Sequence, residues 1–106
     1  MSERIRELQE LLEDEPDDGL LNFTLGQEYL TAGDAAAALP HLEKVVAVDP
    51  RYTVAYRYLG TALEQLGRRD DAAAAWERGI AVAGETGDIQ AGKEMSVFLD
   101  RVRSSG

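Results

Sequence analysis

The stretch GDIQAGKE, residues 87–94, contains the residue types of a phosphate-binding loop. Such a loop uses glycines to bring backbone amides to the phosphates, a lysine to reach them, and a Ser or Thr to hold Mg²⁺. Gly87, Gly92 and Lys93 fit this pattern, but Glu94 occupies the Ser or Thr position, where its charge would repel phosphate. No clear strand pattern precedes the stretch, and Asp88 is placed to cap a helix. We therefore expect a helix start here and no nucleotide site.

The acidic stretch EDEPDDG, residues 13–19, has the composition of a calcium-binding loop. That loop needs alternating oxygen ligands and a Glu about six residues after its glycine. Pro16 stands at a ligand position, and Leu25 stands where the Glu belongs. We expect these acids to end one helix and cap the next, and Asp70 and Asp71 to lie at a helix start, where the dipole favours negative charge. The sequence predicts no metal site.

The usual components of nucleophilic catalysis are missing from the sequence. Cysteine is absent, and the serines, at positions 2, 96, 104 and 105, lie mostly in terminal segments. His41 is the only histidine. Because it stands off the apolar stripe of its helix, we expect it on the surface, without the positioned partner that a catalytic base needs. We predict that the protein is not an enzyme and that it needs no cofactor.

Acidic residues dominate the charge of the chain. Twenty Asp and Glu against eleven Lys and Arg give the 106 residues a formal net charge of −9. This charge repels phosphate and anionic lipid, so we expect neither nucleic acid nor a membrane as a partner. An acid excess with little Lys suits either a basic partner or a high-salt cytoplasm. The absence of a long apolar stretch favours a cytoplasmic location.

Apolar residues recur at helical spacing in six segments, and residues that end or cap helices separate these segments. Pro50 lacks an amide hydrogen and biases Asp49 away from helical angles, so one helix should end there, while the φ of Pro50 suits the start of the next. Pro40 falls beyond the first turn of its helix, so we expect that helix to be bent or irregular near Ala36. The pattern predicts an all-α chain.

The sequence matches itself when it is shifted by 34 residues. The coincident pairs are Leu8 with Leu42, Pro16 with Pro50, Leu25-Gly26 with Leu59-Gly60, Gly33 with Gly67, Ala38 with Ala72, and Leu42 with Trp76. A repeated helix pair covers its apolar face with the next pair, which produces a solenoid. Gly26 and Gly60 are small where the two helices of one pair must approach closely.

The repeated residues resemble the signature of the tetratricopeptide repeat family, W-x2-L-G-x2-Y, then A-x3-F, then P. One unit presents Asn22, Leu25, Gly26, Tyr29, Ala38, Leu42 and Pro50, and the next presents Tyr56, Leu59, Gly60, Leu63, Ala72 and Trp76. The departures are Asn22 for the aromatic residue, Leu63 for Tyr, and Gly84 for the closing proline. Trp76 takes the position of a core aromatic residue, and the resemblance implies that it is buried.

The resemblance implies an all-α, right-handed α-solenoid of antiparallel helix pairs, with about six helices in a single domain over residues 1–106. Residues 19–52 and 53–86 would form two repeats. Residues 2–16 would form an N-terminal flanking helix, in register with the second helix of a repeat. Residues 88–103 would form a C-terminal capping helix.

The resemblance also implies an adaptor, a protein–protein interaction module that holds a peptide or partner segment in its concave groove. The first helix of each repeat lines this groove, and by register its residues are Leu20, Phe23, Gln27, Leu30, Thr31, Val54, Arg57, Tyr58, Thr61, Glu64 and Gln65. Leu20, Phe23, Leu30 and Val54 would form an apolar strip, with Arg57 as a lone cation for a carboxylate.

Other interpretations of the resemblance stay open. Some relatives that bind chaperones clamp a carboxylate with Lys and Asn, but Phe23, Gln27, Tyr58, Asp88 and Gly92 stand at those positions, so that clamp is missing. The chain can instead be a structural or weakly self-associating module, if one neighbour does not cover the apolar residues Met95, Phe98, Leu99 and Val102. It can also be a piece of a longer array. The sequence does not identify the partner.

Overall fold

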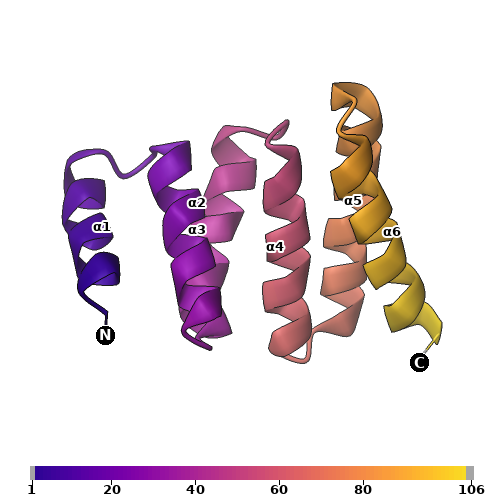
Figure 1. The fold of residues 1–106 in the computed structure, drawn as a ribbon, viewed down its shortest axis with the longest axis horizontal. Helices are drawn as coiled ribbons and strands as arrows, with labels where there is room; N and C mark the ends of the chain where they lie inside the picture. Colours follow the sequence, from indigo (N-terminus) through magenta and orange to yellow (C-terminus); the bar gives the residue numbers. More distant parts are fainter. Residues whose placement is uncertain (1, 105–106) are drawn as a thin grey trace.

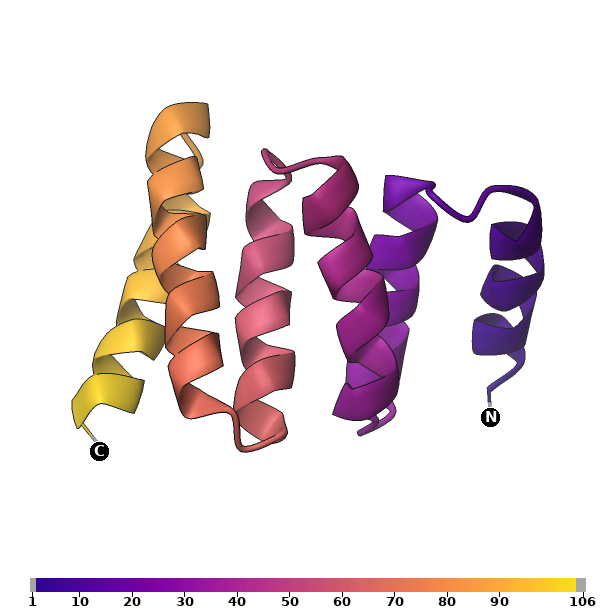
Figure 2. The same ribbon diagram turned by 180° about the vertical axis from the view of Figure 1, so that it is seen from behind.

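The computed structural model describes residues 2–104, and over this range it contains six α-helices and no strand. The helices are α1 (Glu3–Asp14), α2 (Gly19–Thr31), α3 (Ala35–Val48), α4 (Thr53–Gln65), α5 (Arg69–Thr86) and α6 (Ile89–Ser104). Consecutive helices are antiparallel, and the chain advances along the longest axis of the molecule from α1 to α6 (Figures 1 and 2). The molecule measures 40 × 28 × 19 Å. The predicted all-α architecture is confirmed.

The helices are arranged in two layers. Helices α2, α4 and α6 follow one another on one side, which we call the α2–α4–α6 face, and α4 contacts both of the others. Helices α3 and α5 lie behind them, toward the viewer in Figure 2, and do not contact each other. Within the described range, α1 contacts α2 alone. Contacts therefore join near neighbours along the chain, as in a solenoid.

Short polar side chains fix the starts of four helices. Ser2, Asp18, Asp34 and Asp88 each accept a hydrogen bond from the backbone amide three residues later, at 2.9–3.1 Å. These bonds satisfy amides that have no partner inside the helix. The acids of residues 13–19 accordingly form a helix end, a turn and a cap, as expected.

The Asp49-Pro50 junction forms a turn and not the first turn of the next helix. Helix α4 begins only at Thr53. The Tyr52 amide donates a hydrogen bond to the Asp49 carbonyl at 3.0 Å. Pro50 thus occupies the second position of a β-turn, which its fixed φ suits. The expected helix end at Asp49 is confirmed, whereas the expectation that Pro50 begins the next helix is wrong.

Pro40 is tolerated inside an unbroken helix. It is the sixth residue of α3, which runs from Ala35 to Val48 without interruption. Pro40 has no amide hydrogen to donate to the carbonyl of Ala36. Both residues are exposed, so water can reach that carbonyl. The irregularity expected near Ala36 therefore does not interrupt the helix.

Glycines in α2 and α4 receive bulky side chains from the following helix. A Cβ atom placed on Gly26 would lie 2.6 Å from the Leu42 side chain of α3, and one placed on Gly60 would overlap the Trp76 indole of α5. Leu42 and Trp76 are both 0% exposed. The predicted burial of Trp76 is confirmed, and the small residues allow the two helices of each pair to approach closely.

Asn22 and Tyr56, which are equivalent under the 34-residue shift, make the same hydrogen bond. Asn22 Nδ2 donates to the carbonyl of Pro16 at 3.0 Å, and the Tyr56 hydroxyl donates to the carbonyl of Pro50 at 2.8 Å. Both side chains are buried. Asn22 therefore departs from the aromatic signature in shape but still ties the start of its helix to the preceding proline turn.

His41 is half-buried, so its predicted surface position is wrong. Asn22 Nδ2 also donates to the carbonyl of Asp18, which directs Asn22 Oδ1 toward His41 Nδ1 at 3.0 Å. The imidazole therefore donates this bond, and its ring stacks on Tyr29, with centroids 5.7 Å apart. The Tyr29 hydroxyl in turn accepts a hydrogen bond from Gln9 of α1. Burial lowers the pKa of His41.

Candidate functional site

The groove residues expected from the sequence all lie on α2 and α4. Phe23 is only 8% exposed, whereas Leu20 is 66% exposed. Thr31 and Gln65 are exposed at the ends of their helices. The remaining seven side chains are half-buried: Gln27, Leu30, Val54, Arg57, Tyr58, Thr61 and Glu64. The α2–α4–α6 face thus offers partly accessible side chains from both helices.

Three aromatic rings join α2 to α4 on this face. The Phe23 ring lies 5.0 Å from the Tyr52 ring and 5.3 Å from the Tyr58 ring, which it meets edge to face. Such arrangements are favourable beyond the area that they bury. Phe23 therefore acts mainly as a packing residue between helices, and Tyr58 is more accessible than Phe23.

The Arg57 guanidinium lies against the Tyr58 ring, with its Cζ 4.4 Å from the ring centroid. Its Nη2 donates to the Tyr58 hydroxyl at 3.0 Å. Its Nε lies 3.8 Å from Oε1 of Glu94 on α6, close enough for an ion pair but too far for a hydrogen bond. This Nε is buried and has no hydrogen-bond partner among residues 2–104. Arg57 is thus a positioned cation with unused donor capacity.

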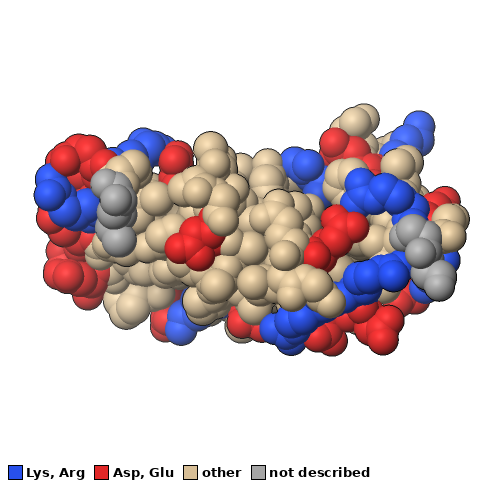
Figure 3. Space-filling view, turned by 90° about the horizontal axis from the view of Figure 1, so that it is seen from below, with Lys and Arg blue, Asp and Glu red and all other residues tan. Residues whose placement is uncertain are grey.

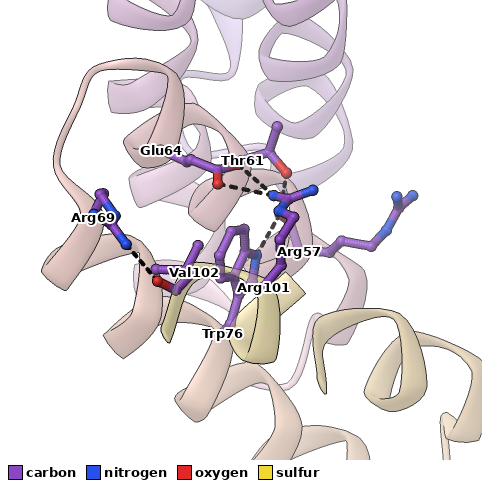
Figure 4. Close-up of polar contacts among 7 residues, drawn as sticks. All are labelled: Arg57, Thr61, Glu64, Arg69, Trp76, Arg101 and Val102. Carbon is purple, nitrogen blue, oxygen red and sulfur yellow. Dashed lines mark hydrogen bonds and ion pairs between the residues drawn. The ribbon is translucent and has the colours of Figure 1, made fainter. Parts of the chain in front are cut away.

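The backbone of Arg57 is fixed from two sides. Its carbonyl accepts hydrogen bonds from the Thr61 hydroxyl at 3.0 Å and from the Trp76 indole nitrogen at 3.2 Å (Figure 4). Because Trp76 is locked in the core, this second bond holds that turn of α4 in place. The backbone that carries the Arg57 side chain is therefore held in a fixed position.

Helix α6 brings a second cation to the α2–α4–α6 face. Arg101 donates from Nη2 to both carboxylate oxygens of Glu64, at 2.8 and 2.9 Å (Figure 4). Its Cζ also lies 5.5 Å from the centroid of the Phe98 ring. Toward the other side of α6, Arg69 of α5 donates to the carbonyl of Val102 at 2.5 Å. Arg57 is therefore not the lone cation that we expected.

Sequence reasoning missed Tyr52, Glu94 and Arg101. Tyr52 belongs to the connection before α4, and the other two belong to α6, from which we expected no groove residues. One signal was available. The pairs Arg57 with Glu94 and Glu64 with Arg101 have opposite charges and the same separation of 37 residues. That separation is close to one repeat, so it indicates helices that stack side by side.

Helix α6 is well covered on its apolar side. Met95, Leu99 and Val102 are 0%, 7% and 6% exposed, and Phe98 lies 5.4 Å from the Trp76 ring. Helices α4 and α5 both contact α6. The concern that one neighbour would leave these residues uncovered is therefore wrong, and they provide no reason for self-association.

The two stretches that resemble ligand loops are helix boundaries. Gly87 ends α5 with a φ of +81°, a left-handed conformation that glycine adopts easily. Asp88 caps α6, and Gly92 and Lys93 lie inside that helix. Within the described range no three His, Cys, Asp or Glu side chains are grouped to hold a metal ion. As expected, Asp70 and Asp71 lie in the first turn of α5.

The acidic charge is concentrated at one end of the molecule. Residues 1–34 contain ten acidic and two basic residues, a formal charge of −8, whereas residues 35–106 contain ten acidic and nine basic residues, a formal charge of −1. Burial, together with the charge of Asp49, raises the pKa of Tyr52, so its phenol is protonated at neutral pH. None of the helices described here has the length and hydropathy to cross a bilayer.

Comparison with known proteins identifies the repeat. A family model described as tetratricopeptide repeat matches residues 23–88. The TPR repeat-containing protein PA0015 of Pseudomonas aeruginosa is 45% identical over 103 residues, which cover 94% of this chain and 98% of that protein. The solution structure of protein BPP2914 from Bordetella parapertussis is 41% identical with a TM-score of 0.85, covering 99% of this chain and 91% of that one. A tetratricopeptide repeat domain protein from Salinibacter ruber is 33% identical with a TM-score of 0.77, over 85% and 91% of the two chains. With its 34-residue period and its stacked antiparallel helix pairs, the chain belongs to the tetratricopeptide repeat family, whose domains generally mediate protein–protein interactions.

Proposed function

We propose that this protein is a non-enzymatic adaptor that holds a segment of a partner protein on its α2–α4–α6 face. The proposal treats residues 1–106 as one domain, with repeats at 19–52 and 53–86, and places the protein in the cytoplasm. The observation that carries it is the state of Arg57. This cation is fixed at its backbone, lies on an aromatic ring, and has a buried Nε without a hydrogen bond.

The surroundings of Arg57 favour a segment that carries a carboxylate beside an apolar side chain. A carboxylate can accept two hydrogen bonds from a guanidinium, which is stronger than the 3.8 Å contact with Glu94. Leu30 of α2 and Val54 of α4, both half-buried, would supply apolar contact on the same face. Tyr58 would remain under the guanidinium and limit its motion.

The net charge of the protein does not oppose an acidic ligand at this place. Almost all of the excess acid belongs to residues 1–34, and the part of the chain that contains Arg57 and Arg101 is nearly neutral. Exposed charges farther apart than about 8 Å are largely screened at physiological salt. The same charge distribution offers no basic surface for nucleic acid, which requires many phosphate contacts.

A display library of random peptides tests the proposal. Selection on the protein should enrich peptides with Asp or Glu next to Leu or Phe. Arg57→Gln should weaken the binding of the selected peptides by at least about tenfold, because their carboxylate loses its charged partner. Glu94→Gln should strengthen binding, because an internal carboxylate no longer competes for Arg57. Calorimetric titration measures both effects.

Arg51→Gln is the matched control. Arg51 also faces a carboxylate without a hydrogen bond, at 3.6 Å from Glu85, but it belongs to the α3–α4 connection and is largely exposed. Its substitution should leave the affinity unchanged. Enriched peptides that lack acidic residues, or an Arg57→Gln protein that binds as tightly as the wild type, would contradict the proposed site.

A further inference from the structure

An exposed apolar patch lies at the α1 end of the molecule. Leu11 of α1 and Leu20 of α2 are 56% and 66% exposed. With Leu21 they line a cavity of about 420 Å³, and the same cavity is bordered by Asp14, Glu15 and Asp18. We call this surface the α1-end face. It combines apolar side chains with an acidic rim.

A second exposed apolar patch lies at the opposite end. Ile89 and Val97 of α6 are 70% and 64% exposed. Together with Ile80 and Ala83 of α5 they line a furrow of about 600 Å³, and Lys93 stands in this furrow. Lys93 takes part in none of the ion pairs found among residues 2–104. We call this surface the α6-end face.

The two faces are placed so that copies of the chain can stack in line. The α1-end face includes the α1–α2 connection, and the α6-end face includes the α5–α6 connection. Both connections lie along the upper edge of the array in Figure 1. A shift of one copy along the long axis of the molecule therefore brings its α1-end face against the α6-end face of another.

The charges of the two ends also fit each other. Residues 1–34 carry a formal charge of −8. Figure 3, seen from below, shows acidic residues gathered at the α1 end. The α1-end face is bordered by Asp14, Glu15 and Asp18, whereas the α6-end face has Lys93 and Asp88, and the Asp88 carboxylate already accepts a hydrogen bond as the cap of α6. Two α1-end faces would repel each other, whereas an α1-end face against an α6-end face brings the acidic rim to Lys93.

We propose that a second copy of this chain occupies the α6-end face, so that molecules stack end to end, α1 beside α6. The contact is heterologous, because the α1-end face of one copy meets the α6-end face of the next, and these are two different surfaces. Such a contact does not close at a dimer, so the average mass should keep rising with concentration. The inference does not involve Arg57, although Leu20 belongs both to the α1-end face and to the predicted groove.

Paired variants separate this stacking from other kinds of association. Leu11→Glu blocks the α1-end face and Val97→Glu blocks the α6-end face, and both residues are exposed enough for the fold to accept the change. In sedimentation velocity from micromolar to millimolar concentration, the wild type should show a continuous rise in mass. Each variant alone should associate at least about tenfold more weakly, because a carboxylate must enter an apolar contact.

Mixing the two variants gives the decisive result. Leu11→Glu retains an intact α6-end face and Val97→Glu retains an intact α1-end face, so an equal mixture should form dimers and stop there. Val48→Glu, at an exposed residue of α3, is the control and should assemble like the wild type. A monomeric wild type at every concentration overturns the proposal. So does a mixture that stays monomeric, or a single variant that associates like the wild type.

Discussion

The two complete helix pairs of this molecule solve the same packing problem with different chemistry. In α2–α3, Gly26 receives Leu42, and a polar group formed by Asn22 and His41 lies beside that contact. In α4–α5, Gly60 receives the indole of Trp76. The first pair is thus held by an aliphatic contact with a buried hydrogen-bond network, and the second by one large aromatic side chain.

The comparison teaches that the two pairs share a close helix contact and a hydrogen bond, although different side chains make them. A small residue in the first helix and a larger one in the second appear in both pairs. A side chain in the first helix also donates to the carbonyl of the preceding proline in both, although it is Asn22 in one pair and Tyr56 in the other. Substitutions at equivalent positions measure how far the two pairs differ in energy.

Trp76→Ala should have the largest effect on stability. The side chain is 0% exposed, contacts α6 through Phe98, and donates its indole N–H to the carbonyl of Arg57. We expect the free energy of unfolding to fall by about 3–5 kcal/mol, measured by urea denaturation. Leu42→Ala is the equivalent change in the first pair and should cost less, since it removes a smaller side chain and no hydrogen bond. Equal losses would show that the aromatic residue contributes no more than the aliphatic one.

Gly60→Ala should follow, with a loss of about 3 kcal/mol from overpacking. The new methyl group overlaps the ring of Trp76, which is rigid and is held by Phe98 and by its hydrogen bond to the Arg57 carbonyl. Gly26→Ala overlaps Cγ and Cδ2 of Leu42, both at 2.6 Å, which is a smaller overlap than the one with the Trp76 ring. Because alanine also favours a helix by about 1 kcal/mol over glycine, Gly26→Ala should cost less stability than Gly60→Ala. Thermal denaturation of both variants measures the difference, and a Gly60→Ala protein as stable as the wild type would refute this account of the contact.

The fold could be predicted from the sequence because its signals are local and repeated. Pro16 and Pro50 mark turns one repeat apart, and Gly26 and Gly60 mark close approaches at the same spacing. The site was predicted less completely, because a resemblance assigns residues to a helix face but not their burial. Phe23 was expected to line a groove and is instead covered by two tyrosine rings.

The polar contacts were harder to predict because the 34-residue repeat places the helices but does not specify which polar side chains of neighbouring helices meet. His41 appeared to stand off the apolar stripe, yet Asn22 has both of its amide hydrogens directed to backbone carbonyls and so turns its oxygen to the imidazole. The contact between Arg101 and Glu64 likewise depends on where α6 stacks. A single sequence gives the order of the helices, but the depth of a polar side chain depends on its neighbours in space.

Asn22→Ala and Tyr56→Phe compare the equivalent hydrogen bonds. Asn22→Ala leaves the His41 imidazole and the Pro16 carbonyl without their partner and removes one of the two hydrogen bonds that the Asp18 carbonyl accepts, so it should cost about 2 kcal/mol. Tyr56→Phe leaves one carbonyl, that of Pro50, and keeps the ring, so it should cost about 1 kcal/mol. Urea denaturation of the two variants gives both values. A larger loss for Tyr56→Phe would mean that the network around Asn22 is not part of what stabilises the first pair.

The smallest effect concerns pH and is confined to the first pair. Burial lowers the pKa of His41 in the folded protein below its ordinary value of 6.5. Above that pH the imidazole is neutral in both states and its contribution to stability is complete. As the pH falls, the unfolded chain binds the proton first, so the contribution is progressively lost down through the folded pKa. His41→Gln retains a donor for Asn22 but cannot titrate. Between about pH 7 and pH 5 the free energy of unfolding should therefore fall more steeply for the wild type than for His41→Gln. Parallel slopes would show that the imidazole is as accessible to protons in the folded state as in the unfolded one, and the polar network of the first pair would then be open to water.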